Sequence, residues 1–263
     1  DVLAKAERPM IIVGQGALTR ADGDAVLAAA IELAEKTSAI SNTISNTWNG
    51  FNVLHTAAAR VAGLDLGLLP GEGGLDVAGI QDAAQSGDVE TVILYGADEI
   101  AGASLGDAFV IYIGSHGDRG AHRADVILPA AAYTEKQAIY VNTEGRPQMT
   151  EQAATPPGEA REDWKIFRAL SEVLGLTLPF DNLAELRRAM FEVAPHFAQI
   201  DGLSESSAPK APAAKKMGKE AFTYSVNDFY FTNPIARASA TMADCAKAKQ
   251  QRDGETEGTG PHG

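Results

Sequence analysis

Three short apolar runs decide the fold of this chain. They read Val-Glu-Thr-Val-Ile-Leu-Tyr at residues 89–95, Ala-Phe-Val-Ile-Tyr-Ile at residues 108–113 and Asp-Val-Ile-Leu at residues 125–128. Each has the length and the β-branched content of a strand, and Pro129 ends the last one. A fourth run, Pro-Met-Ile-Ile-Val at residues 9–13, ends at Gly14. Its unbroken apolar character predicts a strand of a parallel sheet that is buried on both faces.

Helical patterns alternate with these strands. Apolar residues recur at helical spacing between Val26 and Ala34, and Asp22 is placed to cap that helix. A second helix is predicted from Phe51 to Val61, with Gly63 ending it. Alternating strands and helices indicate an α/β fold, with a mostly parallel layered sheet and flanking helices.

From residue 138 the pattern changes to a hairpin followed by two helices. Residues 138–142 and the stretch from Gln148 predict two strands joined by a turn, in which Gly145 adopts a positive φ. One helix is predicted at about 160–174 and another at about 182–193, the second capped by Asp181. The side chains expected to be buried in them are Trp164, Phe167, Leu170, Leu174, Leu183, Leu186, Met190 and Val193.

Composition divides the chain further. Residues 201–221 are rich in Ser, Ala, Pro and Lys, which is typical of a flexible linker, and residues 222–250 bring back aromatic side chains, as in a docking tail. Residues 251–263 have nothing to bury and are expected to be disordered. The predicted organisation is therefore a sheet domain at 1–128, a hairpin and helices packing on it at 129–200, and then the linker, tail and disordered end.

The overall charge excludes several classes of partner. The chain has 263 residues and a net charge of -13, and its acidic surplus lies in residues 1–200, with 27 acidic and 14 basic side chains. Such a surface is unsuited to nucleic acid or to an anionic membrane. No apolar run is long enough to span a bilayer. The start at Asp1, without a signal pattern, suggests a processed or excised fragment.

Glycine-rich segments offer weak evidence for a nucleotide site. Gly14-Gln15-Gly16 follows a strand, but the dinucleotide fingerprint needs glycine at position 19, which is Thr19. A structural turn is therefore favoured. The Pro70–Gly74 stretch lacks the Gly-Lys-Ser/Thr ending of a phosphate loop and is interpreted as a plain loop.

Titratable residues form no catalytic pattern. His116 and His122 are interpreted as parts of a surface loop, His55 as a packed core histidine, His196 as a loop residue after Pro195, and His262 as part of the tail. Glu135, Glu144 and Arg146 are predicted to form a hairpin surface held by Arg–carboxylate pairs. The single cysteine, Cys245, allows no internal disulfide or thiolate cluster. We therefore predict no catalytic, cofactor-binding or metal-binding residue in this chain.

The stretch from Ala124 to Gln148 resembles a signature of the molybdopterin oxidoreductase superfamily. There the pattern runs Ala-Asp-hydrophobic-x-Leu-Pro, then Glu, then Gly-Thr-x-x-Asn-x-Glu-Gly-Arg-x-Gln. The Gly-Thr pair of that pattern is replaced here by Ala138-Ile139. The matching residues are Asp125, Leu128, Pro129, Glu135, Asn142, Glu144, Gly145, Arg146 and Gln148.

Further stretches resemble one branch of that superfamily, the large iron–sulfur (75 kDa or G) subunit of the proton-pumping NADH:quinone oxidoreductase, complex I, of the alphaproteobacterial and mitochondrial type. They are Ile111–Asp118, Thr155–Ile166, and Asp228-Phe229-Tyr230 with Arg237-Ala238-Ser239. The resemblance covers about residues 8–248.

The resemblance implies a structural role. It suggests the carboxyl-terminal part of the subunit, without molybdenum or pterin, supporting electron transfer from NADH to quinone in the peripheral arm. The [2Fe-2S] and [4Fe-4S] clusters would lie in an N-terminal part that is absent here. Implied partners are that part and other peripheral-arm subunits, without nucleic acid or membrane insertion. The implied location is the cytoplasmic face of a bacterial inner membrane, or the matrix side in mitochondria.

Two alternatives stay open at this point. The chain could be the second half of a true molybdopterin enzyme of the formate dehydrogenase or nitrate reductase type. It could also be a nucleotide-binding module that uses Gly14 to Gly16.

Overall fold

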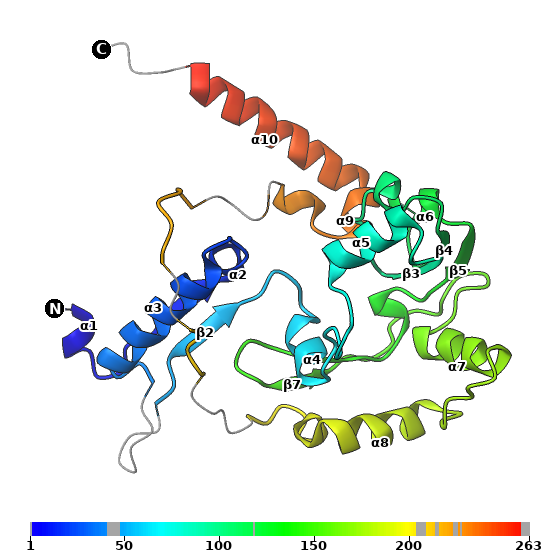
Figure 1. Ribbon diagram of the computed structural model, residues 1–263, viewed down its shortest axis with the longest axis horizontal. Coiled ribbons are helices and arrows are strands. Elements are labelled where there is room, and N and C mark those ends of the chain that lie inside the picture. Colours follow the sequence, from blue (N-terminus) through cyan, green and yellow to red (C-terminus); the bar gives the residue numbers. More distant parts are fainter. Residues whose placement is uncertain are drawn as a thin grey trace. The chain divides into compact units, whose positions relative to one another are not determined.

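The computed structural model describes residues 2–40, 48–117, 119–203, 209–213, 216–222, 226 and 228–258 (Figure 1). The chain forms two compact units, each built from three segments. Unit 1 comprises Asp1–Leu68, Ala138–Thr150 and Leu186–Ser225, and unit 2 comprises Leu69–Gln137, Glu151–Glu185 and Val226–Gly263. The boundaries expected at residues 128 and 200 are therefore not those of the two units.

Unit 1 contains a pair of parallel strands covered by one helix. Its elements are α1 (Val2–Lys5), β1 (Ile11–Gly14), α2 (Gln15–Leu18), α3 (Gly23–Lys36), β2 (Phe51–Leu54), α4 (Arg60–Asp65), β6 (Ile139–Val141), β7 (Pro147–Met149) and η3 (Pro195–Ala198). Ile11 of β1 pairs with Phe51 of β2, and both pack with Ile31 of α3. On the opposite face Ile12 is 57% exposed. The expected burial of both faces of this strand is wrong, because α3 packs against only one of them.

The predicted helix from Phe51 to Val61 is also wrong, because residues 51–54 form β2. Phe51 and Val53 alternate toward the Ile31 cluster with the two-residue period of a strand, and this pairing with β1 overrides the helical spacing. The helix in this region, α4, begins at Arg60 and continues through Gly63, so that glycine does not end it.

Unit 2 is built on three parallel strands in the order β3 (Thr91–Tyr95), β4 (Phe109–Gly114), β5 (Val126–Pro129). These are the three runs from which the fold was predicted, and the α/β class with parallel strands is confirmed. The other elements are α5 (Val77–Ser86), η1 (Gly102–Leu105), α6 (Arg119–Arg123), η2 (Tyr133–Glu135), α7 (Asp163–Val173), η4 (Phe229–Phe231), α9 (Pro234–Ala238) and α10 (Ala240–Gly258). Helix α8 (Leu183–Val193) contains the boundary between the two units.

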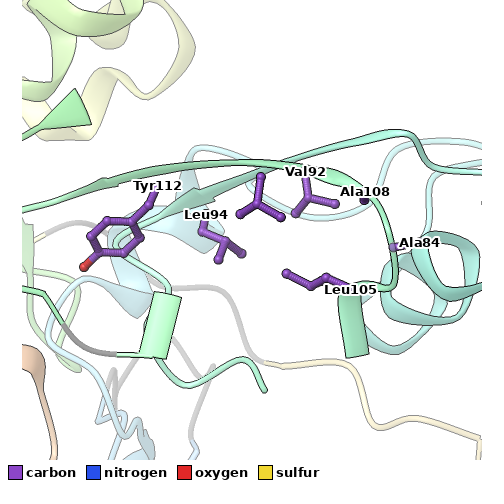
Figure 2. Packing of buried hydrophobic residues seen from close by; sticks show 7 residues of the cluster. Ala84, Val92, Leu94, Leu105, Ala108 and Tyr112 are labelled. Carbon is purple, nitrogen blue, oxygen red and sulfur yellow. The ribbon is translucent and has the colours of Figure 1, made fainter. Parts of the chain in front are cut away.

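One face of the three-stranded sheet carries the core of unit 2. Figure 2 shows Val92, Leu94 and Tyr112 pointing to the same side of the strands, toward Leu105 of η1. Ala84 of α5 closes the same cluster. Each Å² of apolar surface buried in this cluster stabilises unit 2 by about 25 cal/mol.

The predicted hairpin is present in unit 1. β6 and β7 are antiparallel, with Tyr140 paired to Gln148, and Gly145 in the turn has a φ of 80°. The Asn142 Oδ1 atom accepts hydrogen bonds from the amides of Glu144 and Arg146, both at 3.0 Å. The turn thus depends on an asparagine side chain and on a glycine in the left-handed region.

We expect Gly145→Val to lower the free energy of unfolding by about 1–2 kcal/mol, because a side chain with a Cβ disfavours the left-handed region. Thermal unfolding measures the loss. Gly71→Val is the matched control, because Gly71 has no positive φ and a Cβ there meets no atom of the described residues within 4 Å. Equal unfolding temperatures for Gly145→Val and the parent protein would contradict the role given to this turn.

Helices α7 and α8 lie where the sequence predicted them, but they are less buried than expected. Leu174 is 67% exposed and Val193 is 66% exposed, because both lie at helix ends. The cap of α8 is Asn182 and not Asp181, since the Asn182 Oδ1 atom accepts the Glu185 amide at 3.0 Å. The helix begins at Leu183, so the capping position directly precedes it.

The C-terminal part differs from its prediction at one point. The described residues within 201–221 form no helix or strand. Residues 251–258 continue α10, whereas the sequence predicted disorder from their lack of apolar side chains. Once the first turns of a helix form, each added residue needs no new nucleation, and Ala246 anchors α10 at 3% exposure. Residues 259–263, including His262, lie outside the described residues.

Candidate functional site

The carboxyl edge of the three-stranded sheet is the place where ligands bind in most folds of this class. Beyond β3 the chain continues through Gly96 to Asp98, and beyond β4 it continues through Ser115 and His116. Gly96 has a φ of 60°, and its amide donates to the Ile113 carbonyl at 2.8 Å. This turn fixes the start of the loop that contains Asp98.

Asp98 is the buried acidic residue of this edge, with 1% of its surface exposed. Its Oδ1 atom accepts the backbone amide of Gly120, which lies in α6, at 2.7 Å. A Cβ on Gly120 would lie 2.9 Å from that same oxygen and 3.0 Å from the Ala97 carbonyl oxygen. Glycine at position 120 is therefore what lets α6 approach the Asp98 carboxylate.

Tyr112 closes the end of β4 in a similar way. Its hydroxyl donates to the His116 carbonyl at 2.8 Å, so the ring crosses the loop that follows the strand. A Cβ on Gly114 would lie 2.3 Å from the Tyr112 hydroxyl. The loop and the ring can pack together only because residue 114 has no side chain.

Arg237 of α9 lies against Asp98 from the C-terminal segment. Its Nη2 atom is 3.6 Å from the Asp98 Oδ2 atom, and its Nη1 atom is 3.8 Å from Glu99 Oε1. The Asn233 side chain caps α9 by accepting the Ala236 amide at 2.9 Å. Arg237 also donates to the Phe231 carbonyl at 3.3 Å, which ties α9 to η4. The C-terminal segment of unit 2 therefore packs on the carboxyl edge through one guanidinium group.

The chemistry available at this edge is that of a closed, acidic contact. The Gly120 amide, which could have bound an anion, donates to Asp98. An incoming phosphate would meet the carboxylates of Asp98 and Glu99, and Arg237 already pairs with both. The arrangement suits attachment of the chain's own segment better than binding of an anionic ligand.

The histidines near this edge form no metal site among the residues that the structure describes, which exclude Asp118. His116 Nδ1 lies 3.0 Å from the hydroxyl of its neighbour Ser115, and His122 is exposed in α6. In that part of the chain no group of three or more His, Cys, Asp or Glu side chains could hold a metal ion.

His55 is not the packed core histidine that was predicted. It follows β2, is half-buried, and its Nδ1 atom lies 3.2 Å from the Gln15 Oε1 atom. Partial burial, and to a smaller extent the nearby charge of Arg60, lower the pKa of His55 below its ordinary value. Gln15 also accepts the Thr56 amide at 3.4 Å. The Gly14-Gln15-Gly16 turn thus uses its central side chain to hold the loop after β2.

Of the three charged residues predicted to form the hairpin surface, Glu144 and Arg146 form an ion pair and Glu135 lies elsewhere. Arg146 lies 3.7 Å from Glu144, and it also donates to the Asp201 carbonyl. Glu135 lies in η2 of unit 2, where its Oε2 atom accepts the Ala132 amide at 2.9 Å, so its assignment to the hairpin is wrong. A single-turn helix needs this local acceptor for its first amide.

Two other predicted residues have local roles. His196 lies in η3 after Pro195, and its Nε2 atom is 2.8 Å from the Asp65 Oδ2 atom. Cys245 is a half-buried free cysteine of α10.

In unit 1, a second arginine–aspartate pair holds residues 218–221. Arg20 and Asp22 are paired at 2.8 Å, and Asp22 accepts the Gly218 amide at 2.8 Å instead of capping α3. Arg20 donates to the carbonyls of Glu220 and Ala221, at 3.0 and 2.7 Å. The hydrogen bond from Arg20 is the main cause that lowers the pKa of Asp22.

Sequence reasoning missed the Asp98–Arg237 contact. The signal for Asp98 was a carboxylate directly after a buried strand, in Gly-Ala-Asp-Glu at residues 96–99. No sequence signal connects it with Arg237, which lies far along the chain.

Family models match most of the chain. The model of the molybdopterin oxidoreductases matches residues 1–173, and the model of the C-terminal region of the NADH-ubiquinone oxidoreductase G subunit matches residues 192–245. Asp98 lies in the first match and Arg237 in the second.

Curated relatives are similar over nearly the whole chain. The iron–sulfur protein 1 of mitochondrial NADH dehydrogenase (ubiquinone) from Solanum tuberosum is 44% identical over 94% of this chain. The 75 kDa subunit of NADH-ubiquinone oxidoreductase from Reclinomonas americana is 41% identical over 93%, and the NADH-quinone oxidoreductase G subunit from Rickettsia bellii is 39% identical over 99%. The chain spans 32%, 35% and 36% of the lengths of these three relatives.

Among solved structures, acetylene hydratase from Pelobacter acetylenicus is similar with a TM-score of 0.38 and 19% identity, over 48% of this chain and 20% of that one. No helix in the described part of the chain is long and apolar enough to cross a membrane.

Proposed function

Because this chain belongs to the molybdopterin oxidoreductase family, and its relatives are subunits of NADH dehydrogenase, we propose that it is a non-catalytic structural region of the iron–sulfur subunit of the proton-pumping NADH:quinone oxidoreductase. In this role it supports electron transfer from NADH to quinone in the peripheral arm and carries no electron itself. Its partners are the remaining part of the same subunit and neighbouring peripheral-arm subunits.

The observation that carries the proposal is the closed carboxyl edge of the three-stranded sheet. Asp98 is buried under Gly120 and Arg237, at the place where a fold of this class usually binds its ligand. The side chains there hold other parts of the same chain. A carboxyl edge whose side chains hold other parts of the chain supports a framework role.

The residues at this edge suit no pterin cofactor, and the chain has too few cysteines for an iron–sulfur cluster. A pterin cofactor carries phosphate, and at this edge phosphate would meet two carboxylates and a backbone amide that already has an acceptor. Iron–sulfur clusters need several thiolates, and the chain has one cysteine. In this proposal the [2Fe-2S] and [4Fe-4S] clusters of the subunit lie outside these 263 residues.

The same proposal places the subunit at the membrane periphery, on the cytoplasmic face of a bacterial inner membrane or the matrix side in mitochondria. The names of the relatives support this location, since two of them name ubiquinone and one names quinone, and the Solanum tuberosum protein is named as mitochondrial. Attachment would then occur through other subunits.

The test is to purify the subunit that contains these residues from its native host through an affinity tag. We expect NADH-oxidising activity and iron to co-purify with it, and molybdenum, tungsten and the fluorescence of oxidised pterin to stay at background. A molybdopterin enzyme purified in parallel is the positive control for the metal and pterin assays.

Stoichiometric molybdenum with pterin would overturn the proposal and favour the second half of a molybdopterin enzyme. A subunit that purifies without NADH-oxidising activity would overturn its placement in the complex.

A further inference from the structure

The three-stranded sheet of unit 2 has one covered face and one largely uncovered face. Parallel strands are normally buried on both faces, since helices or other segments cover them. Val92 and Leu94 point into the core, at 7% and 5% exposure, whereas Ile93 is 44% exposed and Tyr95 is 54% exposed. The side chains of one strand thus alternate between a dry face and an open one.

The register of the strands joins these side chains into one surface. Thr91 pairs with Phe109, and Ile93 pairs with Ile111, which pairs with Val126, so these five residues share the open face. Phe109 is 46% exposed and Val126 is 38% exposed. Contiguous apolar surface of this kind marks a face that packs against further polypeptide.

Helix α7 shows how far the chain covers this face by itself. The Phe167 ring meets the Tyr95 ring edge-on, with centroids 5.0 Å apart. Ile113, which pairs with Tyr95, is fully buried. Helix α7 thus meets one edge of the Tyr95 ring, which stays 54% exposed, and the amino-terminal half of the face around Ile93 and Phe109 stays open.

The parallel strands of unit 1 have the same deficit. Ile12 is 57% exposed and Leu54 is 54% exposed on the face of β1 and β2 that points away from α3. Two strands are also fewer than a stable sheet usually contains. Among the residues that the structure describes, both units thus have exposed apolar side chains on one face of a sheet.

Charge argues against a second copy as that cover. Asp88, Glu90 and Asp107 are exposed at the amino edge of the sheet, directly beside Phe109, and the Asp125 carboxylate is half-exposed at the start of β5. The Phe109 amide donates to the Glu90 carbonyl at 2.8 Å, which places these acidic residues at neighbouring strand ends. Two copies meeting face to face would bring like charges together.

The length of the relatives supplies a suitable cover. This chain spans 32–36% of each of them, so about two thirds of such a subunit lies outside the match. We propose that the open face of β3, β4 and β5, centred on Ile93 and Phe109, is the docking surface for that remaining part of the same subunit. The inference rests on the proposed function, since it takes the longer iron–sulfur subunit as the intact protein.

Site-specific photo-crosslinking in the intact subunit, within its native host, tests the interface. p-Benzoylphenylalanine is introduced at Phe109, and separately at Ile93 so that a local packing defect at one position does not decide the result. The control position is Val77, which is 59% exposed on α5, the helix that packs on the opposite face. After irradiation, mass spectrometry identifies the crosslinked peptides.

We expect the crosslinker at Phe109 and at Ile93 to react with peptides of the same polypeptide that lie outside the 263-residue stretch. The crosslinker at Val77 should not react with those peptides. Crosslinks to another subunit, to a second copy or to the 263 residues themselves would overturn the proposal, and so would the absence of any crosslink. The proposed function is judged separately, by whether the subunit co-purifies with NADH-oxidising activity.

Discussion

Replacement of Arg237 by Met is expected to lower the free energy of unfolding of unit 2 by roughly 3 kcal/mol. The variant keeps an apolar side chain of similar length but leaves the Asp98 carboxylate, which is 1% exposed, without the guanidinium 3.6 Å away. A buried charge that has lost its partner destabilises the folded state. This free-energy cost is larger than the net stabilisation that the intact ion pair had contributed. Urea denaturation measures the loss.

Two further variants make this prediction specific to the charge pair. Asp98→Asn combined with Arg237→Met removes both charges, so the double variant should be more stable than Arg237→Met alone. Lys247→Met is the matched control, because Lys247 pairs with Asp244 at 3.8 Å on α10, with both side chains more than 70% exposed. Exposed pairs contribute about 0–1 kcal/mol, so this control should change little.

Hydrogen exchange then separates local from global effects. If Arg237 holds the C-terminal segment to the sheet, Arg237→Met should raise exchange first in residues 229–238. Parental stability and exchange in Arg237→Met would show that the contact between α9 and Asp98 does not hold this segment.

The sequence alone predicted the parts of the fold that local patterns specify. The runs that became β3, β4 and β5 are apolar, β-branched and bounded by polar or glycine residues, and the hairpin depends on Gly145 at its turn. Residues 51–61 failed because Phe51, Leu54, Ala58 and Val61 satisfy a helical period while pairing with β1 selects a strand. That pairing is a tertiary contact, which a local pattern does not contain.

The candidate site was harder to predict for the same reason. Its two charged groups, Asp98 and Arg237, are brought together by the packing of α9 on the sheet. Glu135 shows the opposite error, because closeness in sequence to Glu144 and Arg146 suggested one surface, and the chain places it in the other unit. Burial of Asp98 depends on Gly120, whose role becomes visible only when α6 is packed against the loop after β3.

Gly120→Ala is the second variant with a large expected effect, a loss of about 1–3 kcal/mol in the free energy of unfolding. The added methyl would lie 2.9 Å from the Asp98 Oδ1 atom, 3.0 Å from the Ala97 carbonyl oxygen and 3.0 Å from the Tyr112 ring. All three neighbours are held in place, since Asp98 and Tyr112 are buried and the carbonyl belongs to the backbone. The 2.7 Å hydrogen bond from the Gly120 amide to Asp98 must therefore lengthen.

Gly117→Ala, in the same loop, separates this steric effect from a general intolerance of the region. Among the described residues, a Cβ on Gly117 meets the Ala121 methyl at 3.7 Å, which is an ordinary contact. We expect the Gly117 variant to unfold as the parent does, and the Gly120 variant at a lower temperature with faster exchange at residues 229–238. If Gly120→Ala retained parental stability, the close approach of α6 to Asp98 would not be what closes this edge, and the framework role would lose its main structural support.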